Sequence, residues 1–209
     1  MSTDLLTLMQ WLSPGFPVGA FAYSHGLEDI ITSGRISDAD TLQIWMQDLV
    51  SQGSGRSDIS LLARAWRGEA MDELTATAVA LAGCSGRVTE TGEQGAAFCR
   101  TVDAVWDTGI GVQAYPVAVG CAAARHGLPL ELTAQAYLHA FAANLISAAV
   151  RLVPLGQTEG QQVLATLAPL ICSVAQEATA DGAPLFSNCI AADIAAMRHE
   201  TLYSKVFRT

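Results

Sequence analysis

A histidine and a carboxylate lie close together near the N-terminus, and this pair could do chemistry. His25 and Glu28 are three residues apart, a spacing that places both side chains on one face of a helix. Such a pair could act as a general acid and base, or it could supply two ligands of a metal site. A metal site needs further ligands, and no His-x-x-x-His or Cys-x-x-Cys pattern provides them nearby. We therefore favour a polar helix face or a hydrogen bond that braces a loop.

A glycine-rich stretch, Gly109 to Ala114, has the spacing of a dinucleotide-binding loop. Such a loop must follow a strand and open a helix, so that its amides face the pyrophosphate. Here a helical pattern precedes the glycines, and we predict a turn between two helices. A phosphate-binding loop with its lysine is excluded because the only lysine of the chain is Lys205. No catalytic constellation emerges, and we predict a protein that is not an enzyme and needs no cofactor.

Composition limits the partners and the compartment. The formal charge of −9 disfavours binding to nucleic acid and to anionic membranes. The chain is 51% hydrophobic and only 15% charged, so it carries more apolar surface than a monomer of this size easily hides. We therefore expect interfaces with partners or with a second copy. The cysteines are odd in number, widely spaced and without a Cys-x-x-Cys pair, which predicts free thiols in the cytoplasm.

The elements that must position these residues are predicted to be helices. The chain contains 35 alanines and no alternating pattern typical of strands. Leu42, Trp45, Met46 and Leu49 follow helical spacing, and Ser37 with Asp40 could cap that helix. Other helices are expected near residues 5–12 and 23–34, and over residues 57–67, 71–81, 90–106, 116–127, 133–153 and 189–203. One more helix is expected to start at a capping box formed by Thr158 and Gln161 and to be kinked at Pro169. The sequence thus predicts an all-α, single-domain bundle of about nine to ten helices over residues 1–209.

The most apolar of these segments, residues 136–153, raises the question of a membrane span. It is rich in alanine instead of leucine and includes His139, Asn144 and Arg151. These features favour a helix in the protein core over one in a bilayer. Its small residues could also allow a close approach between two copies, although burial within one chain is an equal alternative.

The end of the chain differs from the rest. Residues 198–209 contain three cations, Arg198, Lys205 and Arg208, in an otherwise acidic protein. Large apolar side chains, including Tyr203 and Phe207, alternate with them. Buried unpaired charges are costly, whereas a solvated end has no need of aromatic groups. We therefore predict a tail that is ordered in a groove of a partner, with its aromatic side chains as anchors.

Several blocks of the sequence together resemble the UreF family of urease accessory proteins. They are residues 17–28 (PVGAFAYSHGLE), 115–120 (YPVAVG), 151–157 (RLVPLGQ) and 198–204 (RHETLYS). The blocks lie in order along the whole chain, which makes them far more specific than any single motif. The last six residues depart from the family pattern Ser-Arg-Leu-Phe-Arg-Ser, because Lys205, Val206 and Thr209 replace three of its residues. Lysine keeps the charge at position 205 but lacks the two-pronged geometry of arginine.

The resemblance implies an all-α homodimer that takes part in urease maturation. Proteins of this family bridge the accessory protein UreD (also called UreH) and the GTPase UreG on apo-urease, where nickel is inserted, and they are proposed to regulate GTP hydrolysis by UreG. Partner binding is carried over to the residues that match the family blocks: Pro17, Gly19, Tyr23, Ser24, His25, Glu28, Arg151, Gln157, Arg198, His199, Glu200, Tyr203, Lys205, Phe207 and Arg208.

Two other classes of protein stay open. A metallochaperone that binds nickel directly could use His25, Glu28, His199 or Cys189, if folding brings them together. An enzyme acting on a small molecule would need a closed pocket lined by acids with perturbed pKa values.

Overall fold

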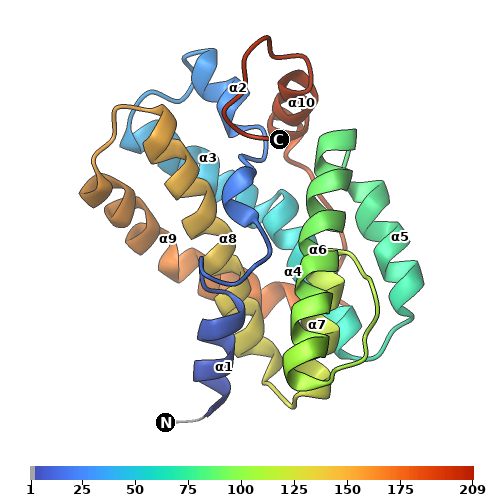
Figure 1. Ribbon diagram of the computed structural model, residues 1–209. Coiled ribbons are helices and arrows are strands. Elements are labelled where there is room, and N and C mark those ends of the chain that lie inside the picture. The colour runs from blue at the N-terminus through green and yellow to red at the C-terminus, as the bar shows by residue number, and fades with distance from the viewer. Residues whose placement is uncertain (1–2) are drawn as a thin grey trace.

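The chain folds into α-helices packed around a common apolar core (Figure 1), in a computed structural model that describes residues 3–209. The helices are α1 (Thr3–Trp11), α2 (Leu27–Thr32), α3 (Ala39–Ser51), α4 (Ser54–Trp66), α5 (Met71–Leu81), α6 (Ser85–Trp106), α7 (Tyr115–Arg125), α8 (Leu130–Leu152), α9 (Gln157–Ala178) and α10 (Ile190–His199), with a short 3-10 helix, η1 (Ala20–Ala22), before α2. Residues 3–209 include no strand. The predicted all-α fold is therefore confirmed.

Helix α4 lies at the centre and packs against α3, α5, α7, α8 and α9. Its contact with α7 is very close because Gly120 faces the backbone of α4: a β-carbon at position 120 would lie 2.3 Å from the carbonyl oxygen of Leu62. A similar approach occurs where Gly95 of α6 meets the loop before α7, since a β-carbon there would lie 2.0 Å from the carbonyl oxygen of Gln113. Glycine thus lets these helices approach more closely than any side chain would permit.

The apolar residues 136–153 fall mostly in α8, whose alanines Ala142, Ala148 and Ala149 are fully buried within the chain. These three small residues therefore pack within the chain, whereas Ala136, Ala140 and Ala143 are half-exposed. In the described part of the chain, no helix is both long and apolar enough to cross a membrane.

The predicted starts of α2, α4, α6 and α8 are wrong by three to five residues, and two predicted caps are wrong by one or two. Asp38, and not Ser37, caps α3: its carboxylate accepts a hydrogen bond from the Thr41 amide at 2.9 Å. Helix α9 begins at Gln157, because the Glu159 carboxylate bonds the amide of Gly156 at 2.7 Å. In both cases a neighbouring polar residue competes for the same exposed amides, and the sequence does not decide between them.

Two further expectations concern breaks between helices. Pro169 lies inside α9, which continues to Ala178, and the kink expected there stays a prediction. The stretch Gly109 to Ala114 joins α6 to α7, with both glycines at positive φ, so the predicted turn between helices is confirmed.

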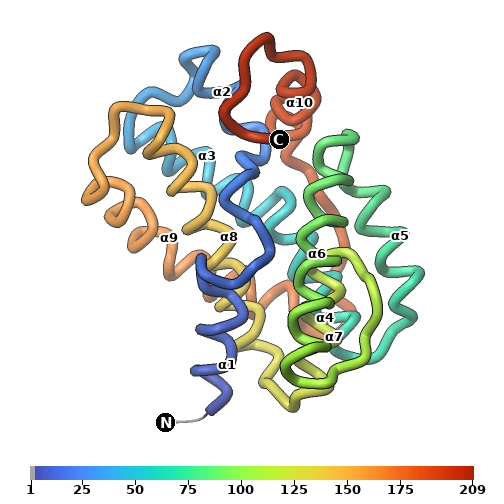
Figure 2. Tube along the Cα trace, in the orientation of Figure 1, coloured from blue at the N-terminus to red at the C-terminus, as the bar shows by residue number. Residues whose placement is uncertain are grey.

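The predicted tail begins slightly later than expected. Helix α10 ends at His199, and the residues that follow, 200–209, are called the tail from here on. Figure 2 shows the tail, in red, curving over α2 and returning to lie beside the segment that precedes α2. The two regions that carry most of the predicted site residues therefore meet in space.

Candidate functional site

The end of the tail is bound to the segment before α2 through backbone hydrogen bonds. The amide of Arg208 donates to the carbonyl oxygen of Ala22 at 2.8 Å, and the amide of Ser24 donates to the carbonyl oxygen of Thr209 at 2.7 Å. The buried hydroxyl of Ser24 donates to the same Thr209 oxygen. The tail is thus ordered on its own chain, and the prediction that it needs a partner's groove to become ordered is wrong.

The predicted helical pairing of His25 and Glu28 is also wrong. His25 has a left-handed backbone, with φ of 59°, and precedes α2 instead of lying in it. Gly26, at φ 80°, packs so tightly on α10 that a β-carbon would lie 2.7 Å from the amide nitrogen of Ala196. This turn sends the two side chains to different partners.

Glu28 holds the tail from one side. Its buried carboxylate accepts hydrogen bonds from the amides of Val206 at 2.6 Å and Phe207 at 3.0 Å, and it bonds Nε2 of His199 at 2.9 Å. Burial opposes ionisation of Glu28, but these hydrogen bonds outweigh it and hold the pKa of the carboxyl below its usual value. An ionised carboxylate with three donors is a strong anchor for a chain segment.

Glu90 of α6 holds the tail from the other side. It accepts a hydrogen bond from the Thr209 hydroxyl at 2.8 Å and forms a short ion pair with Arg87. Nδ1 of His25 lies 3.5 Å from a Glu90 oxygen, and Nε2 of His25 lies 2.5 Å from the hydroxyl of Ser54 in α4. Burial opposes ionisation of Glu90, but the Arg87 charge overcomes it and holds the pKa of Glu90 far below its usual value.

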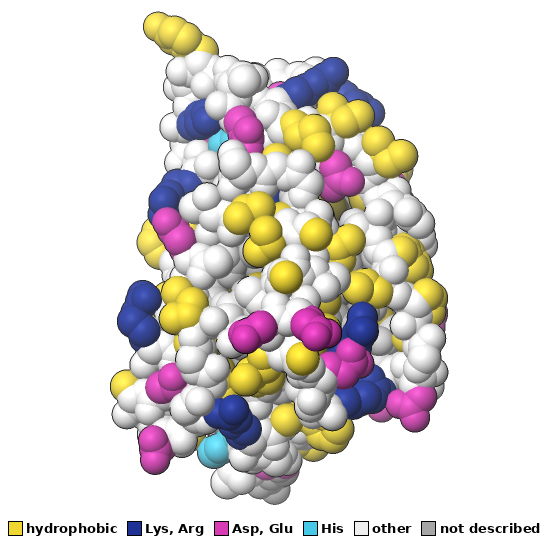
Figure 3. Space-filling view, turned by 90° about the vertical axis from the view of Figure 1, so that its right-hand side faces the viewer, with side chains coloured by type: hydrophobic (Ala, Val, Ile, Leu, Met, Phe, Trp, Pro, Cys, Tyr) yellow, Lys and Arg dark blue, Asp and Glu magenta, His cyan; other side chains and the backbone are white. Residues whose placement is uncertain are grey.

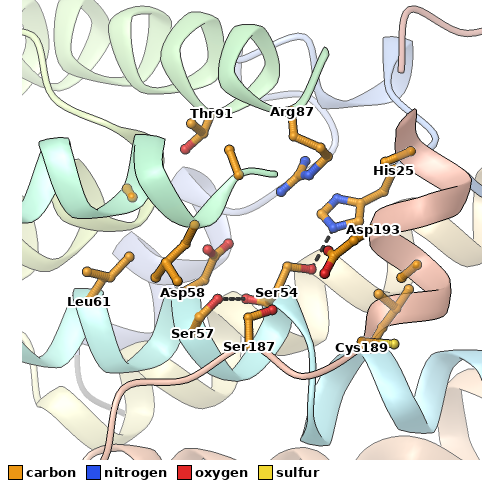
Figure 4. A pocket seen from close by; sticks show the side chains of 16 residues that line it. His25, Ser54, Ser57, Asp58, Leu61, Arg87, Thr91, Ser187, Cys189 and Asp193 are labelled. Carbon is orange, nitrogen blue, oxygen red and sulfur yellow. Dashed lines mark hydrogen bonds between the residues drawn. The ribbon is translucent and has the colours of Figure 1, made fainter. Parts of the chain in front are cut away.

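Beneath His25 lies a small polar cavity, whose lining includes Ser54, Asp58, Arg87 and Asp193 (Figure 4). Its volume is about 30 Å³, room for roughly one water molecule. Asp58 accepts a hydrogen bond from the Tyr137 hydroxyl at 2.8 Å, and burial raises the pKa of Asp58 to about 6. The cavity thus contains a perturbed acid but is far smaller than the pockets that hold organic ligands.

The four residues considered for direct metal binding do not form one cluster. Glu28 and His199 are bonded to each other, His25 faces Ser54 and Glu90, and Cys189 lies at the cavity wall. Within residues 3–209, no three His, Cys, Asp or Glu side chains are arranged to hold a metal ion.

Two arginines help to fix the docked tail, Arg151 of α8 and Arg208 of the tail itself. The guanidinium of Arg151 lies over the Phe207 ring, 4.5 Å from its centre, and donates to the carbonyl oxygen of Phe21 at 3.2 Å. Arg208 bonds both oxygens of Glu93, at 2.5 and 3.0 Å. Phe207 itself is only 3% exposed and anchors the tail to its own chain.

The remaining predicted residues lie on or close to the surface around the tail, with one exception. Tyr23 is buried; its hydroxyl donates to Glu93 and accepts from Arg208 at 3.3 Å. Glu200 fixes the start of the tail by accepting hydrogen bonds from the Ser85 hydroxyl and the Gly86 amide, at 2.7 and 2.9 Å. Exposed or half-exposed residues are Pro17, Gly19, Gln157, Arg198, Tyr203 and Lys205.

Sequence reasoning missed two sets of residues. One set is the polar cluster under the tail: Ser54, Asp58, Arg87, Glu90 and Glu93. The other is an exposed apolar stripe on α10, formed by Ile190, Ile194 and Met197. The helical spacing of the stripe was a visible signal, because buried alanines already occupy the opposite face of the helix. In the polar cluster the spacing within α4 and within α6 was a local signal, but the sequence could not show that the two helices bring these residues together.

The surface over α5, on the right of Figure 1, shows hydrophobic side chains interspersed with both acidic and basic ones (Figure 3). No field of a single sign dominates this view. It therefore gives no sign of a highly charged partner at this face.

Comparison with known proteins places these features in a family. The family model described as UreF matches residues 36–168. The chain is 60% identical to the urease accessory protein UreF of Roseobacter denitrificans, over all of this chain and 96% of that protein. It is 50% identical to the protein of the same name from Ruegeria pomeroyi, over 99% of this chain and 97% of the relative. It is 52% identical to that of Cereibacter sphaeroides strain ATCC 17029, over the full length of both.

Proposed function

The chain belongs to the UreF family of urease accessory proteins, and from that premise we propose that it is a non-enzymatic scaffold of urease maturation. It bridges UreD/UreH and the GTPase UreG on apo-urease, supports nickel insertion and regulates GTP hydrolysis by UreG. It acts in the cytoplasm as a homodimer. The five free cysteines support that compartment.

The observation that carries the proposal is an apolar surface on α10 and the tail. Its members are Ile190, Ile194, Met197, Tyr203 and Val206, of which Tyr203 is fully exposed and Ile190 and Val206 are about 70% exposed. Single exposed apolar residues are common on protein surfaces. A helix that is apolar on its outer face as well as on its buried face is, however, typical of one that a partner covers. We call these five residues the tail surface.

Charges at the edge of the tail surface support a protein partner. Arg198 and Lys205 are exposed beside it, and Lys205 donates to the carbonyl oxygen of Glu200 at 3.0 Å. Apolar anchors with a charged rim are typical of protein interfaces. We assign UreD/UreH to this surface.

The residues buried under the tail have a different role in the proposal. Ser24, His25 and Glu28 hold the tail in place, so they shape the partner surface without touching a partner in this conformation. Exposed Pro17 and Phe21, on the adjoining loop, are the side chains available to UreG.

The test measures UreD/UreH binding to tail-surface variants. The double variant Met197→Ala, Tyr203→Ala should lose at least about 2 kcal/mol of binding, roughly 30-fold in affinity. Ile44→Ala is the matched control, because Ile44 on α3 is 60% exposed and lies outside the tail surface. Circular dichroism should show the same helical content in both. Full-strength binding by the double variant would contradict the assignment.

A further inference from the structure

Two buried histidine–carboxylate pairs hold the docked tail between them. His199 bonds Glu28 at 2.9 Å, and His25 lies 3.5 Å from Glu90. Each carboxylate also accepts a hydrogen bond from the last four residues of the tail. All four side chains are less than 10% exposed. The position of the tail is therefore tied to the protonation of groups that ordinarily change charge near neutral pH.

His25 is in an unfavourable position to become charged. Its Nε2 is paired with Ser54, but its buried Nδ1 has no hydrogen-bond partner. The groups around it come from four elements: Arg87 and Glu90 of α6, Ser54 and Asp58 of α4, Phe141 of α8, and Asp193 of α10 across the cavity.

A proton on Nδ1 would add a second buried cation beside Arg87. Glu90 would then be shared between Arg87, the imidazolium and the Thr209 hydroxyl, which approach the same carboxylate. The cavity beneath His25 has room for about one water molecule, and fuller hydration of the two cations requires that the cluster open. The tail is the element best able to move, because it has no helix of its own, whereas Arg87, Glu90 and Asp58 lie on packed helices.

We propose that the tail is a proton-linked latch, closed over His25 while its ring is neutral and released when His25 takes up a proton. The latch is a property of the chain alone and does not depend on the partner assignment above. It would make the tail surface form at neutral and alkaline pH and loosen in mild acid.

The direction of the pH dependence is set by which form of the protein, closed or open, binds a proton at His25 more readily. Burial and the Arg87 charge lower the pKa of His25 in the closed form, with Glu90 opposing them. When the tail leaves, solvent reaches the ring and its pKa returns toward the ordinary value of about 6.5. The open form therefore binds more protons, and closure is lost as pH falls below about 6.5. One proton changes the opening equilibrium by at most about tenfold per pH unit. Glu28 and Glu90 stay ionised in this range, because their pKa values are lowered.

Hydrogen exchange of the tail amides tests the latch. The amides of Val206, Phe207 and Arg208 are bonded only when the tail is docked. Their opening constants, corrected for intrinsic exchange, are measured between pH 5 and 8. In the wild-type chain opening should increase as pH falls, by up to about tenfold per unit. In the His25→Asn variant the opening constant should be independent of pH. Asparagine is the replacement because it tolerates the left-handed backbone at this position.

Three variants provide the comparison. His139→Asn removes an exposed histidine on α8 and should keep the wild-type slope. His199→Asn and Asp58→Asn should also keep it. The proposal is overturned if the wild-type slope is flat, if His25→Asn retains it, or if either of the last two variants abolishes it. If His25→Asn does not fold, the wild-type chain provides the test. Nuclear magnetic resonance then measures the pH midpoint at which the His25 ring is protonated, which must equal the midpoint of tail opening. Two different midpoints contradict the latch.

Discussion

Replacing Phe207 with alanine should open the tail while leaving the helices folded. Phe207 is almost completely buried, and the Arg151 guanidinium lies over its ring. Truncating a buried phenylalanine costs about 3–5 kcal/mol. Since the ring lies under a surface segment and not in the centre of the core, we take the lower end, about 3 kcal/mol. That corresponds to roughly a 150-fold shift in the docking equilibrium. The increase in the open population is smaller if the free energy of docking is itself less than about 3 kcal/mol.

The chain offers an unusually clean assay for this shift. Lys205 is its only lysine, so a lysine-specific protease cuts at one position, and intact mass reports the loss of the last four residues. Val206 and Phe207, next to the cut, are bonded to Glu28 in the docked tail. When closing is fast relative to cleavage, the rate of cutting follows the population of the open form. Phe207→Ala should therefore be cut about a hundredfold faster than the wild type.

Tyr203→Ala is the matched control. Tyr203 has the same apolar bulk but is fully exposed, so its loss should change docking by less than about 0.5 kcal/mol, or roughly twofold in rate. Equal cutting rates for Phe207→Ala and the wild type would refute the reasoning. So would an equal acceleration by Tyr203→Ala.

Three further outcomes are expected. The pKa of Asp58 is about 6 in the folded chain and lower in the unfolded chain, so ionisation of Asp58 destabilises the fold as pH rises. Asp58→Asn should therefore raise the free energy of unfolding in urea by about 1–3 kcal/mol at pH 8 and change it little at pH 4.5. Gly120→Ala should lower stability by about 3 kcal/mol, because its β-carbon would overlap α4, whereas Gly92→Ala, with open space around it, should raise thermal stability slightly. Lys205→Arg should leave UreD/UreH binding unchanged or slightly stronger in a pull-down titration, since it restores the family residue.

Helix positions could be predicted from the sequence because apolar spacing is a local property. Residues 71–81 match α5 at both ends. The start of α3 was displaced because Ser37 and Asp38 are both good caps, and only the Thr41 contact distinguishes them.

The site was less predictable because its geometry depends on contacts far apart in the chain. The sequence does not indicate that His25 takes a left-handed backbone, since only a few per cent of non-glycine residues do so, although histidine is among the enriched types. The mixed composition of the tail correctly indicated docking, but it could not show that the surface receiving Phe207 belongs to the same chain. The i,i+3 spacing of Arg87 and Glu90 predicts their ion pair, but it could not show the contact with His25, which is more than sixty residues away.

The bond between Ser24 and Thr209 joins residues 185 positions apart, and this has a consequence for biosynthesis. During translation, the N-terminal segment emerges long before the residues that complete its hydrogen bonds are made. Until then Glu28 and Glu90 lack their tail donors, and the part of the tail surface that follows α10 is not held in place. A chain that stops short of residue 206 can form its helices but presents an incomplete tail surface, so incomplete products of the ribosome would engage the partners of the finished protein more weakly.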